Sequence, residues 1–194
     1  MNTDKPVLIA GSTRSGEEES VLKAAVSAGY FPVIAPRHLD RIDEVRELML
    51  GIGYSPVKWS ELTSSPDRTL DFDSILVDVQ GVLARMYGSG DAAFVGGTLV
   101  RVGGHNVLEP VMRGIPLIIG PHHSSFSTAV SRLRSLGLAH IVSSHDELTS
   151  VLAMLCKVEC KKEDVINEFD RMKGNMLVDF EVLITRSGLT ETIR

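Results

Sequence analysis

The sequence predicts an α/β fold, a Rossmann-like parallel sheet with helices on both faces. Short apolar runs alternate with helical patterns almost from end to end, as in sheets whose strands are joined by covering helices. Several of these apolar runs lead directly into glycine-containing loops. With 194 residues, 43% of them hydrophobic, the chain is long and apolar enough to bury a sizeable core.

The first half of the chain supplies regular elements and one irregular stretch. Glycines at 51 and 53 end the second predicted helix, and 60–73 has the polar, proline-containing composition of a surface loop. The expected elements are strands at 7–10, 31–35, 75–77 and, as a short one, 54–58, with helices at 17–28, 41–50 and 82–87.

The second half repeats the same alternation. Ser143 or Ser144 is expected to cap the last helix of the sheet domain. The expected elements are strands at 92–95, 115–119 and 139–142, with helices opening near 106 and at 125–136 and 146–155. We therefore predict a nucleotide-binding domain over 1–160 and a helical extension with a charged face over 161–194.

Charge and composition exclude several functions. The net charge is −5 and the basic residues are scattered, so we expect no nucleic-acid polymer as a partner. No apolar run approaches the roughly 20 residues of a membrane span, and no signal region precedes Val7, which predicts a cytoplasmic chain. Cys156 and Cys160 are expected to be reduced thiols, and we predict no metal site.

The segment from Val95 to Pro110 carries the strongest functional signal, because an apolar strand leads through a glycine loop into a helix. Such a loop lets backbone approach a ligand, and a helix start offers unpaired N–H groups. Asn106 and Glu109 lie three residues apart, on one helix face. They could hold a ribose; alternatively, Asn106 is the N-cap and Glu109 reaches back to it.

Other loops that follow strands favour an anionic ligand, because such loops meet at one sheet edge. Ser12 and Thr13 suit phosphate contact or simple capping equally, whereas Glu17, Glu18 and Glu19 are what any helix start favours. Arg37 directly follows the second strand and Pro36, a place suited to a phosphate clamp. We interpret the histidines of this rim as polar lining rather than ligands or bases, namely His38, His122 and His123.

Five segments together resemble a known family. The chain over about 7–155 is similar to the carboxy-terminal half of 3-deoxy-D-manno-octulosonic acid (Kdo) transferase, a two-domain glycosyltransferase of the GT-B type. The segments are G-S-T-R-S-G-E-E-E at 11–19, A-P-R-H at 35–38, F-V-G-G-T-L at 94–99, G-G-H-N-V-L-E-P at 103–110 and G-P-H at 120–122.

The resemblance implies a function for the predicted site. Kdo would be moved from CMP-Kdo to a lipid A precursor in lipopolysaccharide biosynthesis, at the cytoplasmic face of the inner membrane and without a metal. Pro36 and Arg37 would bind the CMP phosphate, and Gln80, Gly81 and Val82 would contact the nucleotide. The ribose would be held by Asn106, Val107, Leu108 and Glu109.

The sequence departs from the family in two of these loops and lacks the other domain. Arg14 stands where histidine is usual, and Val82 where glutamate is typical. The resemblance places the catalytic base, the acceptor site and the membrane-associating segment in an amino-terminal domain. We therefore expect this chain to be the donor-binding half, inactive alone. The alternatives are another GT-B nucleotide-sugar transferase or epimerase domain, or a non-catalytic nucleotide-binding module.

Overall fold

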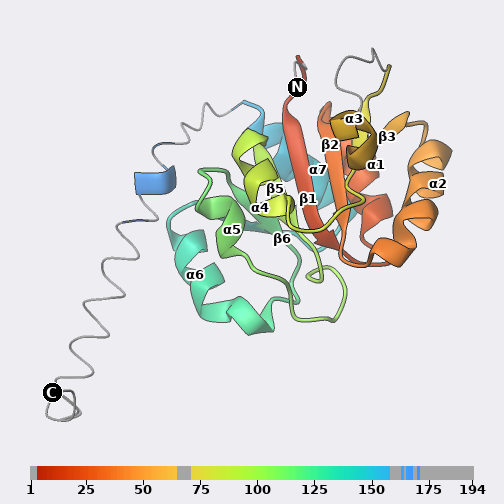
Figure 1. Ribbon diagram of the computed structural model, residues 1–194. Coiled ribbons are helices and arrows are strands. Elements are labelled where there is room, and N and C mark those ends of the chain that lie inside the picture. Colours follow the sequence, from red (N-terminus) through yellow and green to blue (C-terminus); the bar gives the residue numbers. More distant parts are fainter. Residues whose placement is uncertain (1–3, 65–70, 158–162, 164, 168–169, 171–194) are drawn as a thin grey trace, which may run out of the picture.

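The protein contains one seven-stranded parallel sheet (Figure 1). The computed structural model describes residues 4–64, 71–157, 163, 165–167 and 170. The strands lie in the order β3-β4-β2-β1-β5-β6-β7. They are β1 (Val7–Thr13), β2 (Phe31–Pro36), β3 (Pro56–Lys58), β4 (Ser74–Leu76), β5 (Ala92–Val95), β6 (Leu117–Ile119) and β7 (Ala139–Ile141). The predicted Rossmann-like fold class is confirmed.

The sheet order reverses between β1 and β5, where the predicted binding loops leave the sheet. From β1 the chain passes to β2 and then to the edge strand β3, and β4 fills the place between β2 and β3. The chain then returns to place β5, β6 and β7 on the other side of β1. Leu8 pairs with Ala92 and Gly11 with Val95, so β5 ends opposite Gly11 and β1 continues past it to Thr13. In open parallel sheets, such a reversal point is where ligands bind beyond the carboxyl ends of the strands.

One face of the sheet is covered by three helices, α1 (Glu18–Ala28), α2 (Ile42–Ile52) and α7 (His145–Leu155). Alternate strand residues such as Leu8 and Ala10 point into this layer, because successive side chains of a strand face opposite sides. Val45 and Met49 bury the inner side of α2, and Ser144 caps α7 by accepting a hydrogen bond from the N–H of Glu147. The predicted cap at 143 or 144 is therefore confirmed at Ser144.

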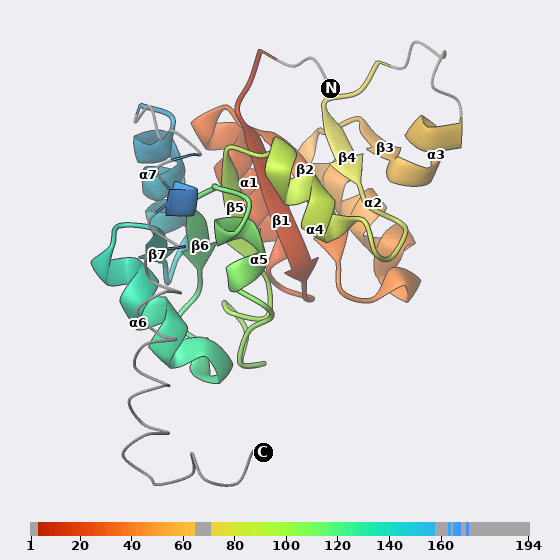
Figure 2. The ribbon, with the colours of Figure 1, turned by 60° about the vertical axis from the view of Figure 1, so that its left-hand side comes forward.

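The opposite face carries α3 to α6, and Figure 2 shows α4 and α5 in front of β1 with α1 behind it. Val7 and Ile9 point into this side, together with Tyr87. Val95 and Leu117 continue the same layer further along the sheet. The helices of this face are α3 (Trp59–Ser64), α4 (Leu83–Met86), α5 (Leu108–Val111) and α6 (Ser127–Ser135).

Helix α3 corrects the expectation that 60–73 begins as a surface loop. The Asp78 carboxylate accepts hydrogen bonds from the N–H and the hydroxyl of Ser60, which supplies the helix start with a cap from 18 residues away. Trp59 and Leu62 pack against the core layer beneath. The cap comes from tertiary structure, so the local sequence gave no sign of it.

Two further findings concern membrane-spanning helices and the predicted carboxy-terminal extension. Within the part of the chain that the structure describes, no helix is both long and apolar enough to cross a bilayer. The predicted extension at 161–194 lies largely outside the described residues, so it stays a prediction. Val165 is described, and it is buried in the core layer beside α6.

Candidate functional site

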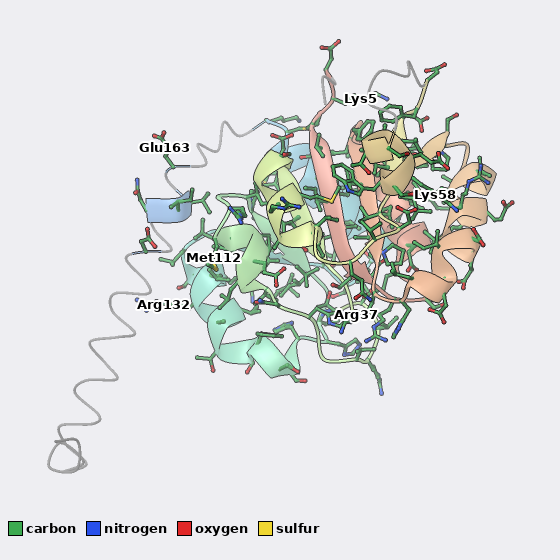
Figure 3. The ribbon with its side chains drawn as sticks, in the orientation of Figure 1. Lys5, Arg37, Lys58, Met112, Arg132 and Glu163 are labelled. Atoms are coloured by element: carbon green, nitrogen blue, oxygen red, sulfur yellow. The ribbon has the colours of Figure 1, made fainter. Side chains whose placement is uncertain are left out.

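The carboxyl ends of β1, β2 and β4 surround a concavity that contains most of the predicted phosphate contacts. Its volume is roughly 210 Å³. Figure 3 shows Arg37 at the sheet edge toward which the β1 arrow points. Of the predicted site residues, the concavity gathers Ser12, Pro36, Arg37, Gln80 and Gly81. Three loops, which follow three different strands, therefore meet at this concavity, as expected for loops after parallel strands.

A backbone hydrogen bond fixes the position of Arg37 at the rim of this concavity. Its N–H donates to the carbonyl of Thr13 at 3.0 Å, which continues the β1–β2 pairing one step past the strand end. The side chain is exposed, and Pro36 beneath it is buried. An exposed guanidinium on a fixed backbone suits an anionic oxygen ligand.

Burial restricts two other predicted contacts to backbone atoms. Thr13 is fully buried, and its hydroxyl has no hydrogen-bond partner, so this side chain cannot reach a ligand at the surface. Val107 is fully buried in the core layer under α5 and α6. At both positions only backbone atoms remain to contact a nucleotide.

Asn106 and Glu109 pair with each other. The Asn106 amide nitrogen donates to the Glu109 carboxylate at 3.0 Å, and its amide oxygen accepts from the N–H of Leu108 at 3.1 Å. The local pairing that competed with ribose binding is therefore present, although the N-cap of α5 is Val107 rather than Asn106. Asn106 remains exposed, and Leu108 and Glu109 are partly so.

The glycine loop after β5 does not offer its first amides to a ligand. The fully buried Glu17 carboxylate accepts from the N–H groups of Gly97 (2.8 Å), Thr98 (3.0 Å) and Leu99 (2.9 Å). It also accepts from the N–H of Arg14 at 2.9 Å. The protein's own carboxylate thus fills the place where a Rossmann-like fold often holds a phosphate.

This finding corrects the interpretation of the three glutamates as ordinary helix-start residues. Glu17 joins two loops, and Glu18, also buried, accepts from the Arg41 guanidinium at 2.7 Å. Only Glu19 matches the expectation, since it is exposed and pairs with Lys23 in the same helix. Sequence reasoning missed the first two because their partners lie far along the chain.

The loop after β5 is also fastened to the loop after β6. Thr98 is buried, its hydroxyl accepts from the N–H of Gly120 at 2.8 Å, and its carbonyl accepts from the N–H of His122 at 2.9 Å. A Cβ at residue 120 would lie 2.2 Å from the Thr98 carbonyl oxygen, so only glycine fits there. Beside this junction lies a second concavity, lined by Arg101, Val102, Gly103, Pro121, His122, His123, Ser124 and Ser127.

A cluster of basic groups, which begins at His38 beside Arg37, was not predicted as a set. The Arg14 guanidinium contacts Nε2 of His38 at 2.7 Å and Nε2 of His105 at 3.3 Å. Partial burial lowers the pKa of His105, and the positive charges of Arg14 and Arg37 lower it further. The sequence signal that could have indicated this cluster is that Arg14 and Arg37 each directly follow a strand.

Among the described residues, no group of three or more His, Cys, Asp or Glu side chains is placed to hold a metal ion. The site consists instead of guanidinium, imidazole, hydroxyl and backbone groups. Such groups bind anions and hydroxyl-rich ligands by hydrogen bonding.

Comparison with known proteins identifies the family. A bifunctional glycosyltransferase/methyltransferase of Fusobacterium nucleatum is 34% identical over 98% of this chain, which spans 29% of that protein. A 3-deoxy-D-manno-octulosonic acid transferase of Haemophilus influenzae is 34% identical over 98% of the chain, which spans 43% of it. The chain belongs to the Kdo transferase family. It covers less than half of the length of these relatives.

The fold has a counterpart among solved structures. The C-terminal CMP-Kdo binding domain of WaaA from Acinetobacter baumannii superposes with a TM-score of 0.74 over 87% of this chain and 89% of that domain, at 23% sequence identity. At that identity the comparison supports the fold. No protein-family model matches the chain.

Proposed function

We propose that this chain is the donor-nucleotide-binding part of a Kdo transferase and that it binds CMP-Kdo. The observation that carries the proposal is the single concavity that gathers Ser12, Arg37 and Gln80 from three loops. The resemblance to Kdo transferases along nearly the whole chain supplies the identity of the ligand.

In this proposal Arg37 binds the phosphate of CMP. A planar guanidinium donates two parallel hydrogen bonds to two phosphate oxygens, which a lysine cannot do. As the sugar departs, negative charge grows on the CMP phosphate, and a guanidinium already in place stabilises that charge in the transition state. Gln80, Gly81 and Val82 contact the nucleotide from the loop after β4.

The ribose is proposed to lie against Asn106 and Glu109. The Glu109 carboxylate still has an oxygen that is not bonded to Asn106 and that can accept from a ribose hydroxyl. The existing pair holds both side chains in place before the ligand arrives, which lowers the ordering cost of binding.

The proposal assigns the remaining parts of the reaction elsewhere. The base that deprotonates the acceptor, the site for the lipid A precursor and the contact with the inner membrane's cytoplasmic face belong to an amino-terminal domain. The transfer uses no metal. We therefore expect the 194-residue chain to bind CMP weakly and to transfer no sugar, because a single domain surrounds only part of the ligand.

Titration of the chain with CMP, UMP and GMP by calorimetry tests the proposal. CMP is expected to bind in preference to the other two, and Arg37→Gln is expected to weaken CMP binding by about tenfold or more, the usual range for a charge-assisted hydrogen bond. Arg132→Gln, on the exposed side of α6, removes the same charge far from the site and serves as the control. UMP binding without CMP binding would instead favour another nucleotide-sugar transferase.

A further inference from the structure

The side-chain partners of the Arg14 guanidinium among the described residues are two imidazole rings. Guanidinium groups donate and never accept, so the Nε2 atoms of His38 and His105 must accept its hydrogen bonds. These contacts occupy two of the five N–H groups of the guanidinium. Among the described residues, the ion pairs of the protein involve neither Arg14 nor Arg37.

Arg14 and Arg37 lie at the same corner of the sheet. The N–H of Arg37 bonds to the carbonyl of Thr13, the residue before Arg14. His38, the residue after Arg37, contacts the Arg14 guanidinium at 2.7 Å. Two strands therefore bring two positive charges together, and no acidic side chain in the described part of the chain forms an ion pair with either.

Arg14 is held in place by a network of hydrogen bonds that links it, through Glu17, to the glycine loop after β5. One oxygen of the buried Glu17 carboxylate accepts from the N–H groups of both Arg14 and Gly97. The carbonyl of Gly97 accepts from the N–H of Gly104, and the next residue, His105, accepts from the Arg14 side chain. Backbone and side chain of Arg14 are thus held from the same loop before any ligand binds.

We propose that Arg14 binds a second negative charge on the donor, the carboxylate of a sugar acid, while Arg37 binds the phosphate. Glu17 acts as a positioning residue for Arg14. The inference rests on the proposed function, which it deepens. A nucleoside monophosphate linked to a neutral sugar carries one negative charge, whereas the same nucleotide linked to a sugar acid carries two. Two unpaired guanidinium groups match the second class of ligand.

Two probes that differ in the carboxylate test this assignment. The methyl phosphodiester of CMP has one negative charge, and CMP-N-acetylneuraminic acid has the same phosphodiester plus a sugar carboxylate. For the 194-residue chain, Arg14→Gln is expected to weaken binding of the second probe about tenfold and binding of the first less than twofold. Arg37→Gln is expected to weaken both probes.

The ratio of the two affinities distinguishes a loss of carboxylate recognition from a loss of loop structure. A variant whose loop is disordered should bind both probes more weakly. Arg14→Lys retains the charge and is expected to keep part of the preference for the sugar acid. Arg132→Gln is expected to leave both affinities unchanged. Equal effects of Arg14→Gln on the two probes, or no effect, would overturn the role of Arg14 while leaving the proposed function intact. Failure of the wild-type chain to bind either probe would overturn both.

Discussion

The Glu17 carboxylate accepts a hydrogen bond from the N–H of Gly97, 80 residues away, at 2.8 Å with both groups buried. This bond crosses between β1 and β5, the point at which the order of the sheet reverses. A carboxylate of the protein therefore closes the first part of the glycine loop. In the proposed function, the nucleotide instead binds at the neighbouring concavity beyond β1, β2 and β4, which is lined by Arg37.

Replacing Glu17 should destabilise the fold strongly. Glu17→Ala leaves four backbone N–H groups without their acceptor, and a lost charged acceptor in a buried site costs about 2–4 kcal/mol. The free energy of unfolding in urea measures this loss. Glu19→Gln, two residues on in an exposed position, is the matched control and should have little effect. Equal stability of the two variants would contradict the role given to Glu17.

The buried pair between Glu18 and Arg41 gives a second test. Arg41→Met leaves the Glu18 carboxylate buried without its cation and should lower the free energy of unfolding by about 3 kcal/mol. The double variant Glu18→Met/Arg41→Met removes both charges and should recover much of that loss, because no isolated charge remains. Urea unfolding of the single and double variants decides the matter. A double variant no more stable than Arg41→Met would show that the charge is not the cause.

Gly96 is expected to tolerate no side chain. A Cβ at this position would lie 2.3 Å from the carbonyl oxygen of Ser12 and 2.5 Å from the Cα of Thr13, and neither backbone atom can move aside cheaply. Gly96→Ala should therefore lower the melting temperature markedly. Gly51→Ala is the matched control in helix α2, where a Cβ meets nothing within 4 Å. It should raise stability by about 0.5–1 kcal/mol, because alanine favours a helix more than glycine does.

The fold could be predicted because its signals are local. The alternation of apolar runs and helical patterns located the strands, and the Ser144 cap is visible within four residues. Helix α3 could not be predicted, because the Asp78 side chain that caps it comes from the next strand's loop. A polar, proline-containing stretch gives no local sign of such a partner.

The grouping of several candidate site residues at one sheet edge was predictable for a different reason. Ser12, Arg37 and Gln80 each follow a strand of a parallel sheet, and that topology brings them to one edge. Glu17 and Glu19 look alike in the sequence, and only the position of Gly97 distinguishes them. Burial of Thr13 and Val107 likewise depends on how the loops pack, which residue spacing does not reveal.

The stability of the protein should fall as the pH drops below about 6.5 because of His140. Burial lowers the pKa of this histidine, whose Nε2 is buried without a hydrogen-bond partner among the described residues. The unfolded chain, with the ordinary histidine pKa of about 6.5, then binds more protons than the native state between the lowered pKa and 6.5. The stabilisation linked to His140 is therefore fully present above the pKa of the unfolded chain, about 6.5, and it is lost as the pH falls toward the lowered pKa of the native state.

His140→Gln removes this titration and should reduce the difference between the free energies of unfolding measured at pH 7.5 and pH 5.5. The difference should not vanish, because the pKa of His105 is lowered as well and contributes with the same sign. An unchanged pH dependence in His140→Gln would show that the buried ring does not drive the loss. Because His140 lies in β7, away from Arg37, the variant should also bind CMP as the wild-type chain does.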